Sequence, residues 1–233
     1  MKNLALAFCS IRPSQYPENV CDNREKEYLR SLKQLERVLP KSFDLLVCEN
    51  TIDDESQIKD DELRDFLSDT EMCATGSESN IGTSNKGMGE LLQLKSALDQ
   101  TDIDKYENVS YITARRFYTC PYVFERTESL KKDALLSNPD FIFLDGRVLE
   151  SYKGPLYNDM FFSMKTERIV EYAQYSMEQL DTNLSKHIGS EYNLYNFVNK
   201  NKLDYEWIEW LGIIRNAWEI NGNTSDLSNF HIS

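Results

Sequence analysis

Short apolar runs alternate along the chain with longer segments whose apolar residues recur at helical spacing. The first run covers residues 4–11 and the second covers residues 43–48. One apolar stripe lies between them, formed by Tyr28, Leu32, Leu35 and Leu39. This spacing predicts a helix that begins after Asp22-Asn23 and ends before Pro40. The order strand, helix, strand is the unit from which parallel sheets are built.

The same alternation continues towards the end of the chain. Further helices are expected at residues 62–67, 88–98, 127–136, 169–180 and 191–198, and further strands at residues 109–113, 140–144, 160–164 and 205–214. This order predicts an α/β fold, with a central, mostly parallel sheet of about six strands flanked by helices. We expect residues 1–220 to form a single domain and residues 221–233 to form a polar C-terminal tail.

Composition narrows the classes of partner. The chain of 233 residues carries 26 Lys and Arg against 39 Asp and Glu, a net charge of −13. Such a field opposes unaided binding to nucleic acid or to an anionic membrane, although it is compatible with a local basic pocket. No run of about 18 apolar residues occurs, so we expect no transmembrane helix. The 5 cysteines are scattered, without a C-x-x-C pair, and only 2 histidines occur. We therefore expect a cytoplasmic protein without structural zinc or a disulfide framework.

A glycine-rich segment before one predicted helix is the first candidate for chemistry. It reads Asn85-Lys86-Gly87-Met88-Gly89. The start of a helix presents unpaired N–H groups and the positive end of the helix dipole, and Lys86 adds a full charge. A diphosphate suits such a site, but the segment matches neither of the common phosphate-binding glycine motifs. An ordinary glycine-rich start of a helix is the simpler interpretation.

Polar side chains also follow several of the predicted strands. They are Ser10 and Arg12, Glu49 and Asn50, Arg115 and Arg116, and Asp145 and Arg147. The carboxyl ends of parallel strands meet at one rim of a sheet, where ligands of open α/β folds bind. Arginine suits a phosphate there because its fork donates two parallel hydrogen bonds. Helix caps, turns and ion pairs with the many acids are the alternative interpretations.

Two carboxyl groups are candidates for a general base. Asp159 precedes an apolar run, where burial would raise the affinity of its carboxylate for a proton. Glu191 follows His187-Ile188-Gly189-Ser190 and begins a predicted helix. A cap or turn for Asp159, and an ordinary position in the first helical turn for Glu191, are the alternatives.

The order of these motifs resembles a family of small glycosyltransferase-like proteins. The segment Asn85-Lys86-Gly87-x-Gly89-Glu90 resembles one motif of that family. The strand end Tyr111-Ile112-Thr113-Ala114-Arg115-Arg116 is similar to its ITGRY segment. Two later segments of the family resemble residues 158–165 and Ser190-Glu191-Tyr192 of this chain. The resemblance as a whole spans about residues 3–217. The family acts in cell-surface polysaccharide and lipopolysaccharide biosynthesis, has viral relatives, and adopts the GT-A fold, a nucleotide-diphospho-sugar transferase sandwich.

The resemblance implies a donor site for a nucleoside-diphosphate sugar. Ser10 and Arg12 would border the nucleotide, and Glu49 would lie against the base. Asn85 and Lys86 would face the nucleotide sugar.

The resemblance also implies how transfer would proceed. Arg115 would lie near the diphosphate. Asp159 would deprotonate an acceptor hydroxyl, with Glu191 as the second choice. The acceptor would be a glycan or another molecule with a hydroxyl group.

One departure from the metal-dependent GT-A pattern concerns the cofactor. Those enzymes carry Asp-x-Asp at the end of the central strand, where this chain has Ala114-Arg115-Arg116. The one literal match, Asp102-Ile103-Asp104, lies before the strand. One possibility is that no divalent metal, Mn²⁺ or Mg²⁺, is used and that Arg and Lys neutralise the leaving diphosphate. The other possibility is that the metal is held elsewhere. Two alternative functions stay open, namely a phage-type enzyme that glycosylates modified DNA bases and a catalytically silent binding protein.

Overall fold

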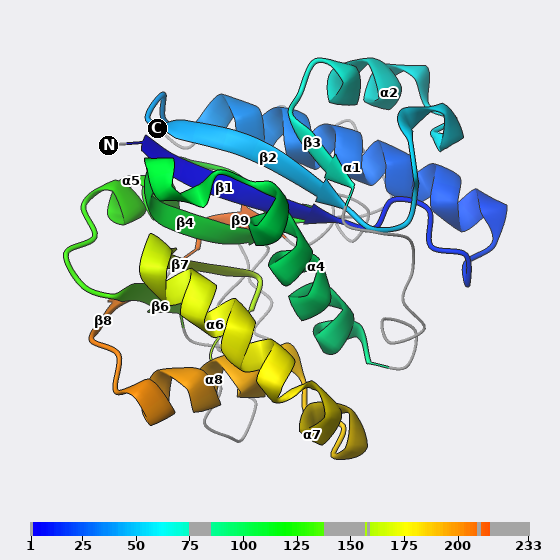
Figure 1. Ribbon diagram of the computed structural model, residues 1–233. Coiled ribbons are helices and arrows are strands. Elements are labelled where there is room, and N and C mark those ends of the chain that lie inside the picture. Colours follow the sequence, from blue (N-terminus) through cyan, green and yellow to red (C-terminus); the bar gives the residue numbers. More distant parts are fainter. Residues whose placement is uncertain (1, 75–84, 138–156, 158, 209–210, 215–233) are drawn as a thin grey trace.

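The computed structural model describes residues 2–74, 85–137, 157, 159–208 and 211–214 (Figure 1). Its centre is a seven-stranded sheet in the order β3-β2-β1-β4-β7-β6-β8. The strands are β1 (Lys2–Cys9), β2 (Phe43–Glu49), β3 (Met72–Ala74), β4 (Tyr106–Thr113), β6 (Ala134–Ser137), β7 (Phe161–Lys165) and β8 (Tyr205–Ile208). Strand β7 runs antiparallel to β4 and β6, whereas the other neighbouring pairs are parallel. A second small sheet pairs β5 (Phe117–Tyr118) with β9 (Ile213–Ile214).

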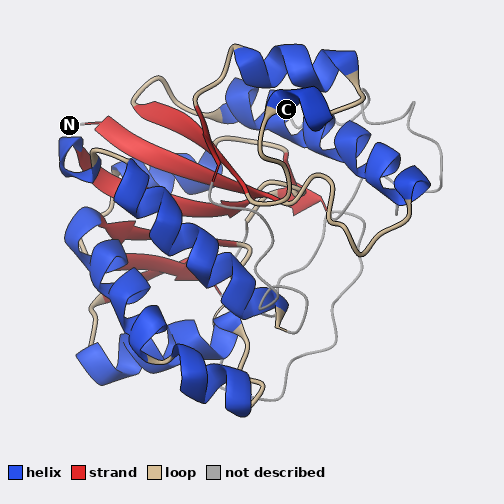
Figure 2. Ribbon diagram, turned by 45° about the vertical axis from the view of Figure 1, so that its right-hand side comes forward, coloured by secondary structure: helices blue, strands red, loops and turns tan. Residues whose placement is uncertain are grey.

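Helices cover both faces of the large sheet (Figure 2). The helical elements are α1 (Glu18–Val38), η1 (Glu55–Gln57), α2 (Asp61–Ser68), α4 (Lys86–Gln100), η2 (Ile103–Lys105), α5 (Tyr122–Glu128), α6 (Thr166–Glu178), α7 (Leu180–Ser185) and α8 (Ser190–Asn201). One hydrophobic core packs α1, α2 and α5 against one face, and a second packs α4, α6 and α8 against the other. None of the helices in the described ranges is long and apolar enough to cross a membrane.

Strand β1 shows why the first apolar run is continuous rather than alternating. Its side chains divide by parity, so that Ala5 and Ala7 enter one core while Leu4 and Leu6 enter the other. All four are at most 1% exposed. A strand covered by helices on both faces needs apolar residues at every position, as is typical of parallel sheets.

The predicted α/β class and the mostly parallel sheet are confirmed, but some predicted elements are wrong. The helix expected at residues 127–136 is divided, because α5 ends at Glu128 and Ala134–Ser137 forms β6. All four residues of β6 are buried between β7 and β8, and this contact overrides their helical propensity. The strand expected at residues 140–144 and the tail at residues 221–233 lie outside the described residues.

Two boundaries also differ from expectation. Helix α1 begins at Glu18 directly after Pro17, so Asp22 and Asn23 lie within it. The late strand expected at residues 205–214 is two strands, β8 in the large sheet and β9 in the small one.

The register of the central strands brings four chain segments to one edge. Cys9 of β1 pairs with Glu49 of β2, and Phe8 pairs with Thr113 of β4. The backbone N–H of Thr113 donates to the carbonyl of Met160, at 2.9 Å. The residues that follow β1, β2 and β4, and those that precede β7, therefore meet at the carboxyl edge of the parallel strands.

Candidate functional site

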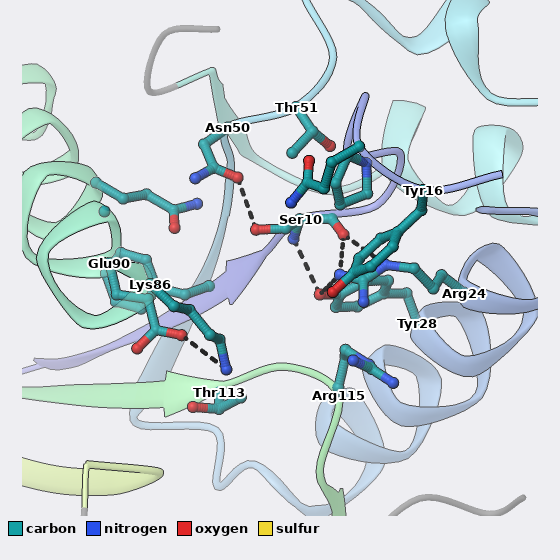
Figure 3. Close-up of a pocket in the computed structure, with 15 residues that line it drawn as sticks. Ser10, Tyr16, Arg24, Tyr28, Asn50, Thr51, Lys86, Glu90, Thr113 and Arg115 are labelled. Carbon is teal, nitrogen blue, oxygen red and sulfur yellow. Dashed lines mark hydrogen bonds and ion pairs between the residues drawn. The ribbon is translucent and has the colours of Figure 1, made fainter. Parts of the chain in front are cut away.

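A cavity of about 400 Å³ lies at this carboxyl edge (Figure 3). Its walls come from the end of β1 and the loop after it, the loop after β2, the first half of α1, the start of α4 and the end of β4. Polar and aromatic side chains dominate the lining. The predicted residues Ser10, Lys86 and Arg115 all contribute to it, as does Asn50. The cavity thus lies where open α/β sheets bind their ligands.

Ser10 links three walls of the cavity. Its Oγ donates to Asn50 Oδ1 at 2.8 Å, which ties the loop after β1 to the loop after β2. Its backbone N–H donates to the hydroxyl of Tyr28 on α1, at 2.9 Å. Ser10 therefore helps to fix the loop that leaves β1, besides lining the cavity.

Arg24 is a cavity residue that the sequence interpretation missed. Its Nε donates to the carbonyl oxygen of Ser10 at 3.0 Å. Its guanidinium carbon lies 5.4 Å from the ring centroid of Tyr16 and 5.6 Å from that of Tyr28. A guanidinium held by aromatic rings and one carbonyl has its orientation fixed while its charge stays uncompensated by these contacts. The sequence signal that could have identified Arg24 is its place four residues before Tyr28, on the helix face that carries the apolar stripe.

Arg115 lines the cavity from the segment that follows β4. Its Nε and Nη2 both donate to Glu27 Oε2 of α1, at 2.9 and 2.7 Å. The ion pair with an acid, which was the alternative interpretation of this arginine, is therefore present. It also positions the guanidinium at the cavity wall, where 29% of the side chain is exposed.

Asn85 and Lys86 have different roles at the start of α4. Asn85 caps the helix, because its Oδ1 accepts from the Met88 N–H at 3.2 Å and its amide donates to the Ile188 carbonyl at 3.1 Å. Lys86 is 84% exposed and lies 3.3 Å from Glu90 Oε1, one turn further along the helix. The charge of Lys86 is thus available at the cavity, whereas the side chain of Asn85 is used to hold the helix.

Gly87 of α4 lies in close contact with the start of α8. A Cβ at this position would lie 2.6 Å from the backbone nitrogen of Ser190 and 2.8 Å from its Oγ. Real Cβ atoms do not approach backbone so closely, so only glycine permits this contact between α4 and the start of α8. The glycine therefore brings Ser190 and Glu191 beside α4.

Three carboxyl groups, those of Glu90, Asp159 and Glu191, interact electrostatically near the contact between α4 and α8. Glu90 lines the cavity, and Asp159 accepts a hydrogen bond from Ser190 Oγ. Burial, and then the negative charge of Asp159, raise the pKa of Glu90 to about 7, against the opposing effect of Lys86. Burial and the charge of Asp159 also raise the pKa of Glu191. Asp159 and Glu191 lie outside the cavity lining itself, so Glu90 is the member of this group that faces the cavity.

Arg12 and Glu49 lie away from the cavity lining. The guanidinium of Arg12 forms ion pairs with Glu18, Asp22 and Glu25 of α1. Glu49 is fully buried, and its carboxylate accepts from the backbone N–H groups of Ile11 and Thr51 and from the Thr51 hydroxyl. Burial raises the pKa of Glu49, although these hydrogen bonds oppose the shift. Both residues thus hold the loops that shape the cavity.

The described acids at this edge can be compared with the ligand sets that hold metal ions in proteins. Within residues 2–74, 85–137, 157, 159–208 and 211–214, no three or more His, Cys, Asp or Glu side chains are arranged to hold a metal ion. Asp102 and Asp104 lie at the opposite, amino end of β4, around the short helix η2. We therefore derive no step through a divalent metal.

Replacing Glu90 with Gln should flatten the pH dependence of folding stability. The folded pKa of about 7 exceeds the ordinary value of 4.5, so the folded state binds this proton more tightly than the unfolded chain. The free energy of unfolding should therefore fall as the pH rises from about 4.5 to about 7, by on the order of 2 kcal/mol. In Glu90→Gln most of this decrease in the free energy of unfolding should be absent. At about pH 8 the variant should therefore be more stable than the wild type.

Urea unfolding at about pH 5 and about pH 8 measures this difference. Glu36→Gln is the matched control, because Glu36 is an exposed acid on α1. The control should follow the wild type at both pH values. A Glu90→Gln variant with the wild-type pH dependence would show that Glu90 ionises as an ordinary exposed acid.

Known structures share this fold. A putative nucleotide-diphospho-sugar transferase from Desulfovibrio desulfuricans G20 matches 100% of this chain and 92% of its own, with a TM-score of 0.59 and 14% identity. The bifunctional IspDF from Campylobacter jejuni matches 90% of this chain and 50% of its own, with a TM-score of 0.51 and 15% identity. Neither the protein-family profiles nor the curated proteins give a match. The chain therefore has the nucleotide-diphospho-sugar transferase fold, as the sequence predicts, and the narrower resemblance to the small glycosyltransferase-like family stays a prediction.

Proposed function

We propose that the chain is a glycosyltransferase that moves a sugar from a nucleoside-diphosphate sugar to an acceptor hydroxyl, as in polysaccharide biosynthesis. The observation that carries this proposal is the cavity of about 400 Å³ at the carboxyl edge of β1, β2 and β4. Its volume suits a small organic ligand, and its lining is mixed polar and aromatic. Its place in a nucleotide-diphospho-sugar transferase fold supports a nucleotide sugar as that ligand.

The positive side chains of the cavity support binding of a diphosphate. Lys86, Arg24 and Arg115 reach its walls from three different elements. Cationic side chains stabilise the negative charge that develops on a leaving diphosphate, as a metal ion does in other enzymes. In our proposal these three groups bind the diphosphate and neutralise it as it leaves. Ser10 and Asn50 border the nucleoside on the side of β1 and β2.

Asp159 is the proposed general base of an inverting transfer. The acceptor hydroxyl gives its proton to the Asp159 carboxylate while its oxygen bonds to the anomeric carbon of the sugar. The bond from that carbon to the diphosphate oxygen breaks, and the diphosphate keeps the electron pair. The hydrogen bond from Ser190 orients the carboxylate. Glu191 is the second candidate, because burial and the charge of Asp159 raise the pKa of its carboxyl, which favours uptake of a proton.

Lys86→Ala and Arg115→Ala should each weaken binding of the donor nucleoside diphosphate. Each variant removes one of the cations that we place against the diphosphate, and we expect the Kd to rise about tenfold per variant, which is 1.4 kcal/mol. Isothermal titration of the folded variants measures the effect. Lys95→Ala is the matched control, because Lys95 lies on the same helix and also pairs with an acid, Asp99, but is not part of the cavity lining. Unchanged affinity in both variants would overturn the cavity as the donor site.

A further inference from the structure

Charge is distributed unevenly around the cavity. Arg24 and Arg115 occupy one side, on α1 and after β4, whereas Glu90 and Lys86 occupy the other side, on α4 (Figure 3). Arg115 is paired with Glu27, and Lys86 with Glu90. Among the described residues of the lining, the α4 side therefore differs from the rest in carrying a carboxyl group that faces the cavity.

Further carboxyl groups reinforce the negative charge on that side. Asp159 and Glu191 are close enough to Glu90 to raise its pKa, and Lys86 supplies the opposing charge from the same helix. Tyr111 also contacts Glu90, because its hydroxyl lies 3.4 Å from Glu90 Oε2 and donates to it. In the described part of the chain, three acids, one lysine and one phenol thus form this group.

The Glu90 carboxyl is held in place and partly open. Its side chain is 18% exposed and its Oε1 contacts Lys86. The ring of Tyr111 stacks between Phe8, at 4.5 Å, and Phe162, at 4.8 Å, which fixes the phenol that donates to Glu90. A carboxylate fixed at a cavity wall can accept hydrogen bonds from the hydroxyls of a sugar. It repels a ligand that carries a carboxylate of its own.

We propose that Glu90 selects the transferred group, so that the donor carries an uncharged sugar rather than an acidic one. Glu90 accepts hydrogen bonds from the hydroxyls of that sugar, and with Asp159 and Glu191 it disfavours a sugar that bears a carboxylate. This inference rests on the proposed function, because it presumes that the diphosphate binds against Arg24, Arg115 and Lys86 and that the sugar then lies beside Glu90.

Matched donor pairs test this selection. UDP-glucose and UDP-glucuronate differ only in the oxidation state of one sugar carbon, and GDP-mannose and GDP-mannuronate form the second such pair. The measurement is made at about pH 8, where the Glu90 carboxyl, with its pKa of about 7, is ionised. With the pair whose nucleoside diphosphate binds, the wild type should then hold the neutral donor at least about tenfold more tightly than the acidic one. Glu90→Gln removes the facing charge and should reduce that ratio by about threefold or more. Equal affinity of the wild type for both donors, or an unchanged ratio in Glu90→Gln, would overturn the inference.

Two controls separate selection of the sugar from the other possible effects. Glu36→Gln removes one negative charge from the exposed side of α1 and should keep the wild-type ratio. UDP or GDP alone measures any effect of Glu90→Gln on the diphosphate through Lys86, its ion-pair partner. That effect is common to both donors of a pair and cancels in their ratio. If neither nucleoside diphosphate binds the wild type, the proposed function fails together with this inference. If one binds but the donors are not distinguished, only the selection by Glu90 fails.

Discussion

Asp159→Asn should lower kcat for sugar transfer by about 10²- to 10⁴-fold while leaving donor affinity unchanged. The amide cannot take the proton of the acceptor hydroxyl, yet it has the shape of the carboxylate and can still accept the hydrogen bond from Ser190 Oγ. Asp159 lies outside the cavity lining, so the donor should bind as before. Steady-state kinetics of transfer, together with isothermal titration of the donor, separate the two effects.

Ser190→Ala is the companion variant. It removes the hydrogen bond to Asp159 and leaves the carboxylate in place, so its kcat should fall much less than that of Asp159→Asn. Near-normal turnover of Asp159→Asn would exclude Asp159 as the base. A parallel series at Glu191 would then decide whether that acid has the role instead.

Glu49→Ala should lower the free energy of unfolding by about 3 kcal/mol or more. The buried N–H groups of Ile11 and Thr51 both donate to this carboxylate, and the substitution leaves them without that acceptor. The loops after β1 and β2 would lose their common anchor. Urea unfolding at constant pH measures the loss.

Glu49→Gln distinguishes the supporting role from contact with a nucleotide base. The glutamine side chain has nearly the same shape as glutamate and retains one carbonyl oxygen as an acceptor. The variant should therefore fold and be less destabilised than Glu49→Ala. If Glu49 only supports the loops, as its burial suggests, this variant should bind the nucleoside diphosphate with wild-type affinity. A strong loss of affinity in a stably folded Glu49→Gln would instead favour the position against the base that the family resemblance implies.

The fold is largely predictable from the sequence, because burial on both sides of a parallel sheet leaves a strong pattern. The apolar stretches at residues 4–9 of β1 and 45–48 of β2 follow from their two cores. The four-residue strand β6 is not predictable in the same way. Its segment is too short to show a period, and its partners β7 and β8 lie far away in sequence.

The candidate site is predictable where residues follow strands and, for Lys86, where a glycine-rich segment begins a helix. Ser10 and Arg115 line the cavity because the carboxyl ends of parallel strands meet there. Arg12 follows β1 just as closely, but the acids on the first turns of α1 bind its guanidinium. Whether an arginine after a strand lines the cavity or pairs with acids of α1 depends on distances in the folded protein. Arg24 reaches the cavity from within a helix, and only its position among the apolar residues of α1 hinted at this role.

The glycine-rich segment shows a second limit. The sequence alone permits a phosphate-binding turn or an ordinary start of a helix. Gly87 lies against the backbone of Ser190, so its missing side chain is accounted for by contact between α4 and α8. Lys86, which the sequence analysis places at a site for a diphosphate, does line the cavity.

The most direct test of the account is the thermal stability of the protein with nucleoside diphosphates and nucleotide sugars, with EDTA or with Mn²⁺. A ligand that binds only the folded state raises the Tm, by an amount equivalent to about 2.7 kcal/mol at a hundredfold excess over its Kd. We predict a clear rise with one nucleoside diphosphate and its sugar, largely retained in EDTA because Lys86, Arg24 and Arg115 supply the positive charge. A rise only with Mn²⁺ would contradict the role given to these cations. No rise with any of these ligands would contradict the account of the cavity as a donor site.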